Sequence, residues 1–272
     1  MKTKLVKLWA TLTAALTFGA VFFLFAYIFL KGADAISWAF LTEAPRGTVL
    51  GTEGGILPAI LGSLAYTAIA VLFAAVLGIG TALYQVFYCP SPRRAEAITV
   101  TMQCMSGVPS IVMGLFGYSL LVLSLGWGTC LLAGGVTQGI MILPFITLRA
   151  EKALREIDPS LLRASYAMGV SRSHTIRRIA LPQAAPQLVS GVILGGCYAM
   201  GAAAPLIFTG AVILAKNPTD LMKPAMALPY HLYMLLTQGT SPTNAYGTAF
   251  VMMVLVLLSN TIAALLTRRN TQ

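Results

Sequence analysis

Long apolar runs alternate with short polar segments along this chain. Six of the runs are long enough to cross a bilayer as helices, because about 20 apolar residues span its hydrocarbon core. We therefore predict transmembrane helices over residues 8–30, 56–87, 98–125, 130–148, 188–214 and 245–267. The pattern indicates an all-α, polytopic membrane protein with a single membrane domain over residues 1–272 and no separate soluble domain.

Composition agrees with this interpretation and excludes a soluble globular protein. Hydrophobic residues make up 57% of the chain and charged residues 10%, and the mean hydropathy is +0.81. The net charge of +10 would suit nucleic acid, but the basic residues form short clusters beside the apolar runs. That arrangement is typical of cytoplasmic loops in membrane proteins. We expect the lipid bilayer as the partner, and no nucleic acid.

The basic residues also predict the topology. Of the 18 lysines and arginines, 14 fall on the cytoplasmic side of a six-helix arrangement, and Lys31, Arg46, Lys216 and Lys223 fall outside. Positive charge is enriched in cytoplasmic loops. We therefore expect a multi-pass protein of the cell (inner) membrane with both termini in the cytoplasm.

The first apolar run has the length of a retained span. Its roughly 23 residues exceed the 7–15 residues of a signal-peptide core. The mixed segment that follows, residues 31–55, should include a short interfacial helix around residues 36–40, with Trp38 at the membrane boundary.

The third apolar run is interrupted by proline and glycine. Ser106, Gly107, Pro109 and Ser110 lie near its middle. Proline removes a backbone donor and glycine loosens a helix, so this span should be kinked or broken at membrane depth. Broken helices in transporters commonly mark the substrate path. Close packing of small residues is the alternative interpretation.

The longest polar interruption, residues 151–187, predicts two short helices. Asp158 and Pro159 suit the start of the first helix, and Gly169 suits its left-handed end. Ser171 can cap a second helix over residues 172–180, which Pro182 should end. Four arginines make the surface of this pair basic: Arg163, Arg172, Arg177 and Arg178.

The spacing within this interruption resembles a known family motif. Gly169 is followed by nine residues, then Ile179, one residue, and Leu181-Pro182. This matches G-x9-I-x-L-P, the core of the cytoplasmic loop in permease subunits of ABC importers. The Glu-Ala-Ala that usually precedes the glycine reads Arg163-Ala164-Ser165 here.

That resemblance implies six transmembrane helices of the type I ABC importer permease kind. It also implies that a cytoplasmic two-helix coupling loop, at about residues 150–186, docks on an ATP-hydrolysing subunit. The positions that the resemblance implies for this coupling are Arg163, Ala164, Gly169, Arg172, Ile179, Leu181 and Pro182.

Three further stretches are similar to permeases of the phosphate-uptake ABC importers. They are residues 54–63 before the second span, residues 107–117 in the third, and residues 201–206 in the fifth. The resemblance implies the shorter of two permease subunits, a pair of ATP-hydrolysing subunits, a second permease subunit, and a secreted or periplasmic substrate-binding protein. It further implies transport of phosphate or a related oxyanion by alternating access.

The fifth span departs from the phosphate-family pattern. Tyr198 replaces an arginine, and Ala202 and Ala203 replace glutamate and threonine of Gly-Glu-Thr-Ala-Pro. Three explanations are open: a partner permease supplies the charge, backbone N–H groups at the broken third span hold the anion, or the substrate is a different, uncharged or zwitterionic solute. The pathway residues we nominate are Ser106, Gly107, Pro109, Ser110, Tyr198 and Thr209.

Other functional classes find little support in the sequence. We expect no enzyme, cofactor or metal site, because no nucleophile, base and orienting group come together and neither His174 nor His231 has a partner at ligand spacing. The chain has no G-x-x-x-x-G-K-[ST] loop, so ATP hydrolysis requires a separate subunit. A membrane scaffold whose basic loop recruits a cytoplasmic protein remains an alternative, as does a secondary transporter.

Overall fold

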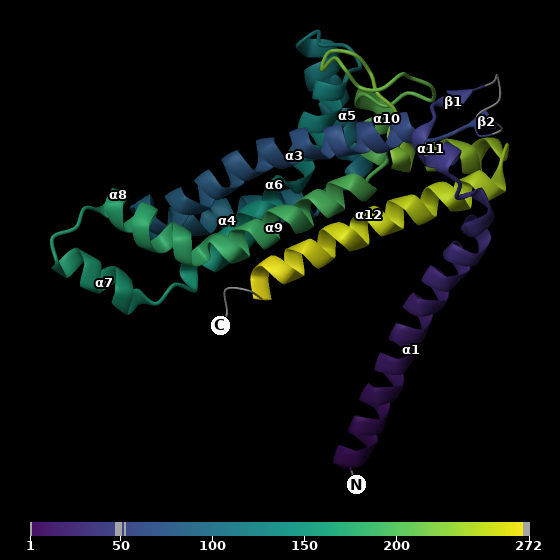
Figure 1. Cartoon of the computed structure of the whole chain (residues 1–272). Coiled ribbons are helices and arrows are strands. Elements are labelled where there is room, and N and C mark those ends of the chain that lie inside the picture. Colours follow the sequence, from purple (N-terminus) through teal and green to yellow (C-terminus); the bar gives the residue numbers. More distant parts are fainter. Residues whose placement is uncertain (1, 47–50, 52, 269–272) are drawn as a thin grey trace.

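The computed structural model describes residues 2–46, 51 and 53–268, and its regular structure is almost entirely helical (Figure 1). Turns of 3-10 or π helix are labelled η. The elements, in chain order, are α1 (Lys2–Gly32), η1 (Ala33–Ala35), α2 (Trp38–Thr42), β1 (Pro45–Arg46), β2 (Glu53–Gly54), α3 (Leu57–Leu83), η2 (Tyr84–Tyr88), α4 (Pro92–Ser106), α5 (Ser110–Gly117), η3 (Tyr118–Ser124), α6 (Leu131–Arg155), α7 (Pro159–Ala167), α8 (Arg172–Thr175), η4 (Ile176–Ala180), α9 (Leu181–Gly201), α10 (Ala204–Thr209), α11 (Leu228–Gln238) and α12 (Pro242–Arg268).

The number of apolar helices agrees with the predicted six spans. Within the described residues, five helices are long and apolar enough to cross a membrane, and the bent pair of Pro92–Ser106 and Ser110–Ser124 makes a sixth. The last predicted span, residues 245–267, lies within α12, and Arg269 is outside the described residues. The all-α prediction is confirmed, with one two-residue antiparallel strand pair, Pro45 opposite Gly54, as a small addition.

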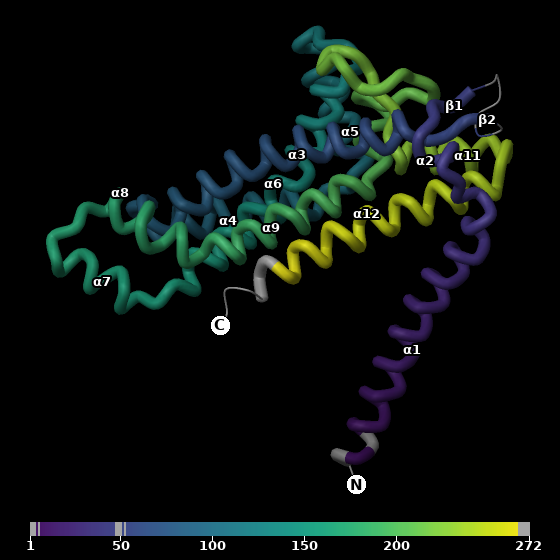
Figure 2. Tube along the Cα trace, viewed as in Figure 1, coloured from purple at the N-terminus to yellow at the C-terminus, as the bar shows by residue number. Residues whose placement is uncertain are grey.

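Helix α6 lies at the centre of the bundle and packs closely on α3 and α9. A methyl group at Gly134 would come within 2.5 Å of the Tyr66 ring, and one at Gly195 within 2.9 Å of Ile146. Small residues let membrane helices approach this closely and gain van der Waals contact. Figure 2 shows α3, α6, α9 and α12 running side by side along the bundle.

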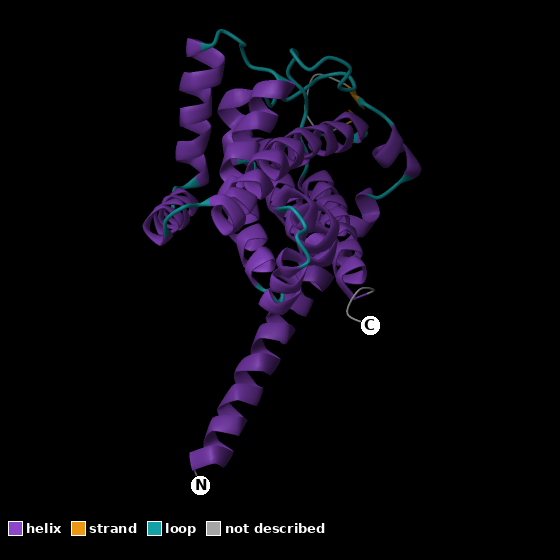
Figure 3. Ribbon diagram, turned by 90° about the vertical axis from the view of Figure 1, so that its left-hand side faces the viewer, coloured by secondary structure: helices purple, strands orange, loops and turns teal. Residues whose placement is uncertain are grey.

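Helix α1 leaves the bundle and contacts it near one end. Tyr27 and Phe29 pack on Tyr246 and Phe250 of α12, with ring centroids 5.8 and 5.3 Å apart. The rest of α1 exposes large apolar side chains, and Figures 1 and 3 show it extending away from the other helices. Its apolar surface suits contact with lipid or another membrane chain.

The two ends of the bundle differ in structure. Helices α7 and α8 form one end, and α2, α5, α10, α11 and the strand pair lie at the other (Figure 1). The interfacial helix predicted around residues 36–40 is α2, which Ser37 caps by accepting a hydrogen bond from the Phe40 N–H at 3.1 Å. Trp38 is 81% exposed, and its position at the membrane boundary stays a prediction.

The predicted fifth span is wrong at both ends. The span was predicted over residues 188–214, but the helix runs from Arg172 to Gly201. It passes through Pro182, which was predicted to end the helix over residues 172–180. A π-helical turn over Ile176–Ala180 precedes this proline, and the Leu181 N–H bonds to the Ile176 carbonyl five residues back. The wider turn avoids the clash that a proline ring makes in a regular α-helix.

Candidate functional site

The two-helix part of the coupling loop, residues 158–182, begins with the predicted cap. The Ser160 N–H donates to Asp158 Oδ1 at 2.8 Å, and Pro159 occupies the first helical turn of α7. This backbone hydrogen bond stabilises the carboxylate, so it lowers the pKa of Asp158 from its ordinary value. Local sequence therefore determines where α7 starts.

The corner between α7 and α8 is a Schellman motif. Gly169 has φ +75°, its N–H donates to the Tyr166 carbonyl at 3.0 Å, and the Val170 N–H donates to the Ser165 carbonyl at 3.3 Å. A methyl group at Gly169 would meet no atom within 4 Å. The glycine is therefore required by backbone conformation and not by lack of space.

A buried pair of hydroxyl groups joins α7 to α8. Ser165 Oγ and Thr175 Oγ1 lie 2.8 Å apart, and both side chains are buried. Ser165 stands where the family has the last alanine of Glu-Ala-Ala, so here that position holds the two helices together. Nothing in the spacing of the two residues along the chain predicted this contact.

Most of the predicted coupling residues lie on the surface of the loop. Exposed side chains include four arginines and three apolar residues: Arg163, Arg172, Arg177, Arg178, Leu161, Tyr166 and Met168. Ala164 and Pro182 are also exposed, whereas Ile179 and Leu181 are half-buried. The mixture of cations and apolar side chains could contact a protein partner, and the docking role of these residues remains a prediction.

The base of the coupling loop packs on the ends of three bundle helices. Ile176 and Ala180 lie in one buried cluster with Ala82 of α3, Leu154 of α6 and Leu188 of α9. Interiors of this kind transmit displacement because they are close-packed. Movement of the loop would therefore displace these helix ends.

The break predicted in the third span is present. Helix α4 ends at Ser106 and α5 begins at Ser110, with a bend of 99° between the two halves of the span. Pro109 has an extended conformation, φ −57° and ψ 138°. Ser106, Gly107 and Pro109 are exposed and Ser110 is half-buried, so three of these pathway candidates border open space on this chain.

A second break separates α9 from α10 at the fifth-span signature. Gly201 ends α9 and Ala202 is extended, with φ −88° and ψ 107°. The side-chain amide of Gln138 in α6 donates to the carbonyls of Ala199 at 2.9 Å and Ala202 at 3.2 Å. Irregular backbone is tolerated at membrane depth where protein satisfies its polar groups, and Gln138 does so here.

The remaining pathway candidates occupy different surroundings. Tyr198 lies on α9 and is 56% exposed. Thr209 is fully buried and its hydroxyl donates to the Pro205 carbonyl at 2.7 Å, so it presents no free hydroxyl to a ligand. Their assignment to the pathway remains untested.

Two polar residues of α3 hold the segment that follows α10. Tyr66 donates its hydroxyl to the Gly210 carbonyl at 2.6 Å, and Ser63 Oγ accepts from the Leu228 N–H at 2.7 Å. Both side chains are buried. Neither residue was predicted from the sequence, although a tyrosine and a serine within an apolar run are a signal for polar contacts inside the bundle.

Comparison with known proteins identifies the family. Residues 74–272 match the family model described as binding-protein-dependent transport system inner membrane component. A probable ABC transporter permease protein, YqgI of Bacillus subtilis, is 30% identical over 97% of this chain and 92% of its own length. A phosphate transport system permease protein, PstA 1 of Mycobacterium tuberculosis, is 33% identical over 78% of this chain and 70% of its own length.

Solved structures share the fold at lower identity. A chain of the MetNI methionine ABC transporter in an inward-facing conformation matches with a TM-score of 0.67 at 21% identity, covering 80% of this chain and 96% of that one. A chain of a bacterial alginate ABC transporter, in complex with a periplasmic protein carrying an alginate pentasaccharide, matches with a TM-score of 0.69 at 19% identity, covering 99% and 98%. The chain belongs to the binding-protein-dependent transport system inner membrane components, the family of ABC importer permease subunits.

Proposed function

We propose that this chain is a permease subunit of an ATP-driven importer for phosphate or a related oxyanion. The observation that carries the proposal is the continuous helix Arg172–Gly201, which joins the coupling loop at one end to the broken fifth-span signature at the other. One element thus connects the predicted ATPase contact with the predicted substrate path. The permease named PstA supports phosphate as the cargo.

The coupling loop would carry the mechanical step. ATP binding closes a pair of ATPase subunits, and the exposed face around Met168 and Arg163 moves with them. The buried cluster beneath the loop passes this displacement to α3, α6 and α9. The bundle then opens outward to a loaded substrate-binding protein, and hydrolysis resets it, with both termini remaining in the cytoplasm.

The substrate path would run along the exposed surface at the two breaks. A methyl group at Gly201 would meet no atom within 4 Å, and Gly107 is exposed at the bend between α4 and α5. A second permease subunit would complete the path by covering this surface. It could also supply the positive charge that Tyr198 does not provide.

A different cargo is the second candidate. Tyr198, Ala202 and Ala203 stand where the phosphate family has charged or hydroxylated side chains, and a neutral path suits an uncharged or zwitterionic solute. An intramembrane cation costs several kcal/mol and is kept for a function, so its loss bears on the substrate.

The test measures ATPase stimulation in the reconstituted transporter. The complex of both permeases and the ATPase pair is presented in turn with binding proteins loaded with phosphate, another oxyanion, an amino acid or a neutral sugar. Stimulation by phosphate supports the first candidate. Stimulation by an uncharged or zwitterionic solute alone would replace it with the second.

A further inference from the structure

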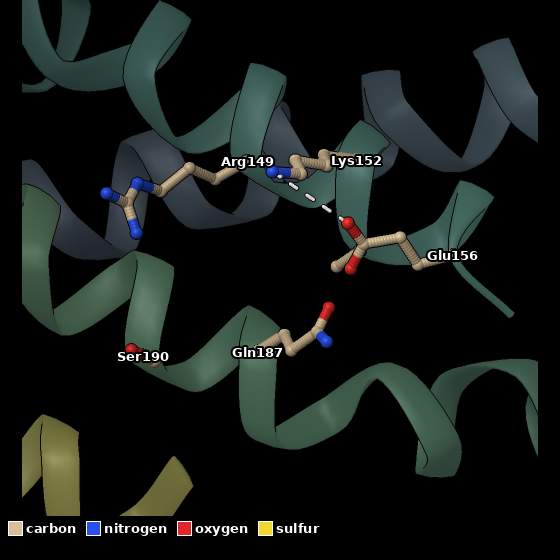
Figure 4. A pocket seen from close by; sticks show the side chains of 6 residues that line it. Arg149, Lys152, Glu156, Gln187 and Ser190 are labelled. Carbon is tan, nitrogen blue, oxygen red and sulfur yellow. Dashed lines mark ion pairs between the residues drawn. The ribbon is translucent and has the colours of Figure 1, made fainter. Parts of the chain in front are cut away.

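A cavity lies between the cytoplasmic end of α6 and the start of α9. Its volume is about 400 Å³, and it is lined by Arg149, Lys152, Ala153, Glu156, Gln187 and Ser190 (Figure 4). Arg149 is the first charged residue after the apolar part of α6, so the cavity sits where that helix leaves the membrane. It is separate from the exposed face of the coupling loop and from the two breaks.

Arg149 is held in place without a carboxylate partner. Its guanidinium lies 4.7 Å from the centroid of the Phe145 ring, and a methyl group at Gly191 would be 3.4 Å from Arg149 Cβ. The side chain therefore rests between a ring and a glycine on α9. Among the described residues, no carboxylate lies within 4.0 Å of its guanidinium.

The other charges leave the cavity with one excess cation. Lys152 Nζ lies 3.8 Å from Glu156 Oε1, and the two side chains are 78% and 50% exposed. An exposed pair at this distance is weak, so Lys152 can turn to another anion at little cost. Figure 4 shows Lys152, Glu156 and Gln187 around one space, with Arg149 extending towards the part of α9 that carries Ser190.

Neutral donors on α9 complete the cavity. Gln187 and Ser190 are three residues apart, so they share a face of the helix, and both line the cavity. A guanidinium, an ammonium, an amide and a hydroxyl group therefore line one cavity from two helices, together with the carboxylate of Glu156. Arginine forks and multiple N–H and O–H donors match the several oxygens of a phosphate group.

From this geometry we propose that the cavity binds a phosphate group at the cytoplasmic surface of the membrane. The same chemistry could come from free phosphate leaving the substrate path or from the phosphodiester headgroup of an anionic lipid. Basic pockets between transmembrane helices on the cytoplasmic side bind such headgroups. The free-phosphate source rests on the function proposed above, whereas the lipid source does not.

The experiment compares two matched charge-removing variants of the assembled transporter in nanodiscs, without ATP or binding protein. The pocket variant is Arg149→Gln with Lys152→Gln, and the control is Lys216→Gln with Lys223→Gln at the other end of the bundle. Radiolabelled inorganic phosphate binding is measured in neutral phosphatidylcholine. Retention of phosphatidylglycerol is counted by native mass spectrometry in mixed nanodiscs. Phosphate bound by the ATPase subunits is common to both variants.

We expect the pocket variant to lower the affinity for phosphate or for phosphatidylglycerol by about tenfold or more. The control should leave both affinities unchanged. Loss of phosphate binding assigns the free anion, and loss of phosphatidylglycerol assigns the lipid headgroup. Ser190→Leu, which fills the cavity without changing its charge, should lose binding of the same ligand. This variant keeps the test valid if the double variant misfolds. If all variants bind both ligands equally, the proposal is overturned.

The result can be separated from the cargo question. Transport of an uncharged solute with lipid retention still dependent on Arg149 would remove the phosphate-import proposal and keep the pocket. Phosphate transport with unchanged binding in every pocket variant would remove the pocket proposal and keep the phosphate-import proposal.

Discussion

The two ends of the helix Arg172–Gly201 are stabilised in different ways. At the coupling end, the contacts that shape the corner are local, and Ser165 and Thr175 are only 10 residues apart. At the other end, Gln138 reaches a carbonyl 61 residues away, and Tyr66 reaches one 144 residues away. The corner of the coupling loop is shaped by contacts within its own sequence, whereas the break at the signature needs the assembled bundle.

The largest expected effect concerns the coupling end. Gly169→Asp should reduce ATP-driven uptake to less than about a tenth, because a left-handed residue with a side chain costs about 1–2 kcal/mol and the acid alters a basic surface. Uptake and membrane content would be measured together. Gly169→Asn is the matched control, since asparagine and aspartate both tolerate the left-handed conformation and differ in charge, so it should retain more uptake than the aspartate variant. Normal uptake by the aspartate variant would remove the docking assignment.

The next effect concerns the break in the third span. Replacing Pro109 and Ser110 with leucine together should let α4 and α5 become more continuous and fill space at the bend. Transport should fall by about tenfold, which corresponds to about 1.4 kcal/mol, while expression stays near normal. Pro92→Ala, at the exposed start of α4, is the control. Undiminished uptake by the double variant would mean that the break serves packing alone.

Acid should loosen α11, at the end of the bundle away from the coupling loop, before it loosens the coupling loop. His231 in α11 is 2% exposed, and burial lowers its pKa from 6.5 to about 4. Between these values the unfolded state binds more protons, so stability present above pH 6.5 is lost as the pH falls towards 4, by up to a few kcal/mol. Protection of residues 228–238 against hydrogen exchange, measured relative to the slower intrinsic exchange at lower pH, should therefore fall at pH 5 compared with pH 7.

Replacing this histidine provides the control for that measurement. His231→Leu should abolish the acid-dependent loss of protection, whereas His174→Gln on the exposed coupling loop should not. An equal loss of protection in wild type and His231→Leu would assign the acid sensitivity to another group.

Removing the long-range hydrogen bonds of Gln138 at the fifth-span signature should lower the stability of the protein by an intermediate amount. Gln138→Leu leaves the Ala199 and Ala202 carbonyls without this donor, which should destabilise the protein by about 1–3 kcal/mol. Thermal unfolding in detergent would measure the loss, with exposed Gln238→Leu as the control. Equal melting temperatures would show that water or neighbouring backbone satisfies these carbonyls.

The smallest effect should come from the local hydroxyl pair. Ser165→Ala should weaken the coupling loop by about 1 kcal/mol, seen as faster hydrogen exchange over residues 159–180. Adding Thr175→Val removes the remaining hydroxyl, so the double variant should be less than additive. Strict additivity would show that the two groups do not interact.

The sequence alone determined the class of protein and the local shape of the coupling loop. Apolar runs predicted the six spans, and Asp158, Gly169 and Ser171 predicted two helix starts and a left-handed corner that the structure contains. The family resemblance rested on the same stretch, and the match over residues 74–272 confirms it. These signals act over a few residues, so they can be recognised without knowledge of the fold.

Only the tertiary structure determined how the fifth span is built. A π-helical turn lets the helix pass Pro182, and Gln138 satisfies carbonyls exposed by the break near Gly201. The cavity between Arg149 and Ser190 likewise joins residues of two helices. Sequence periodicity cannot report such features, because they depend on which distant groups the packed bundle brings within hydrogen-bonding distance.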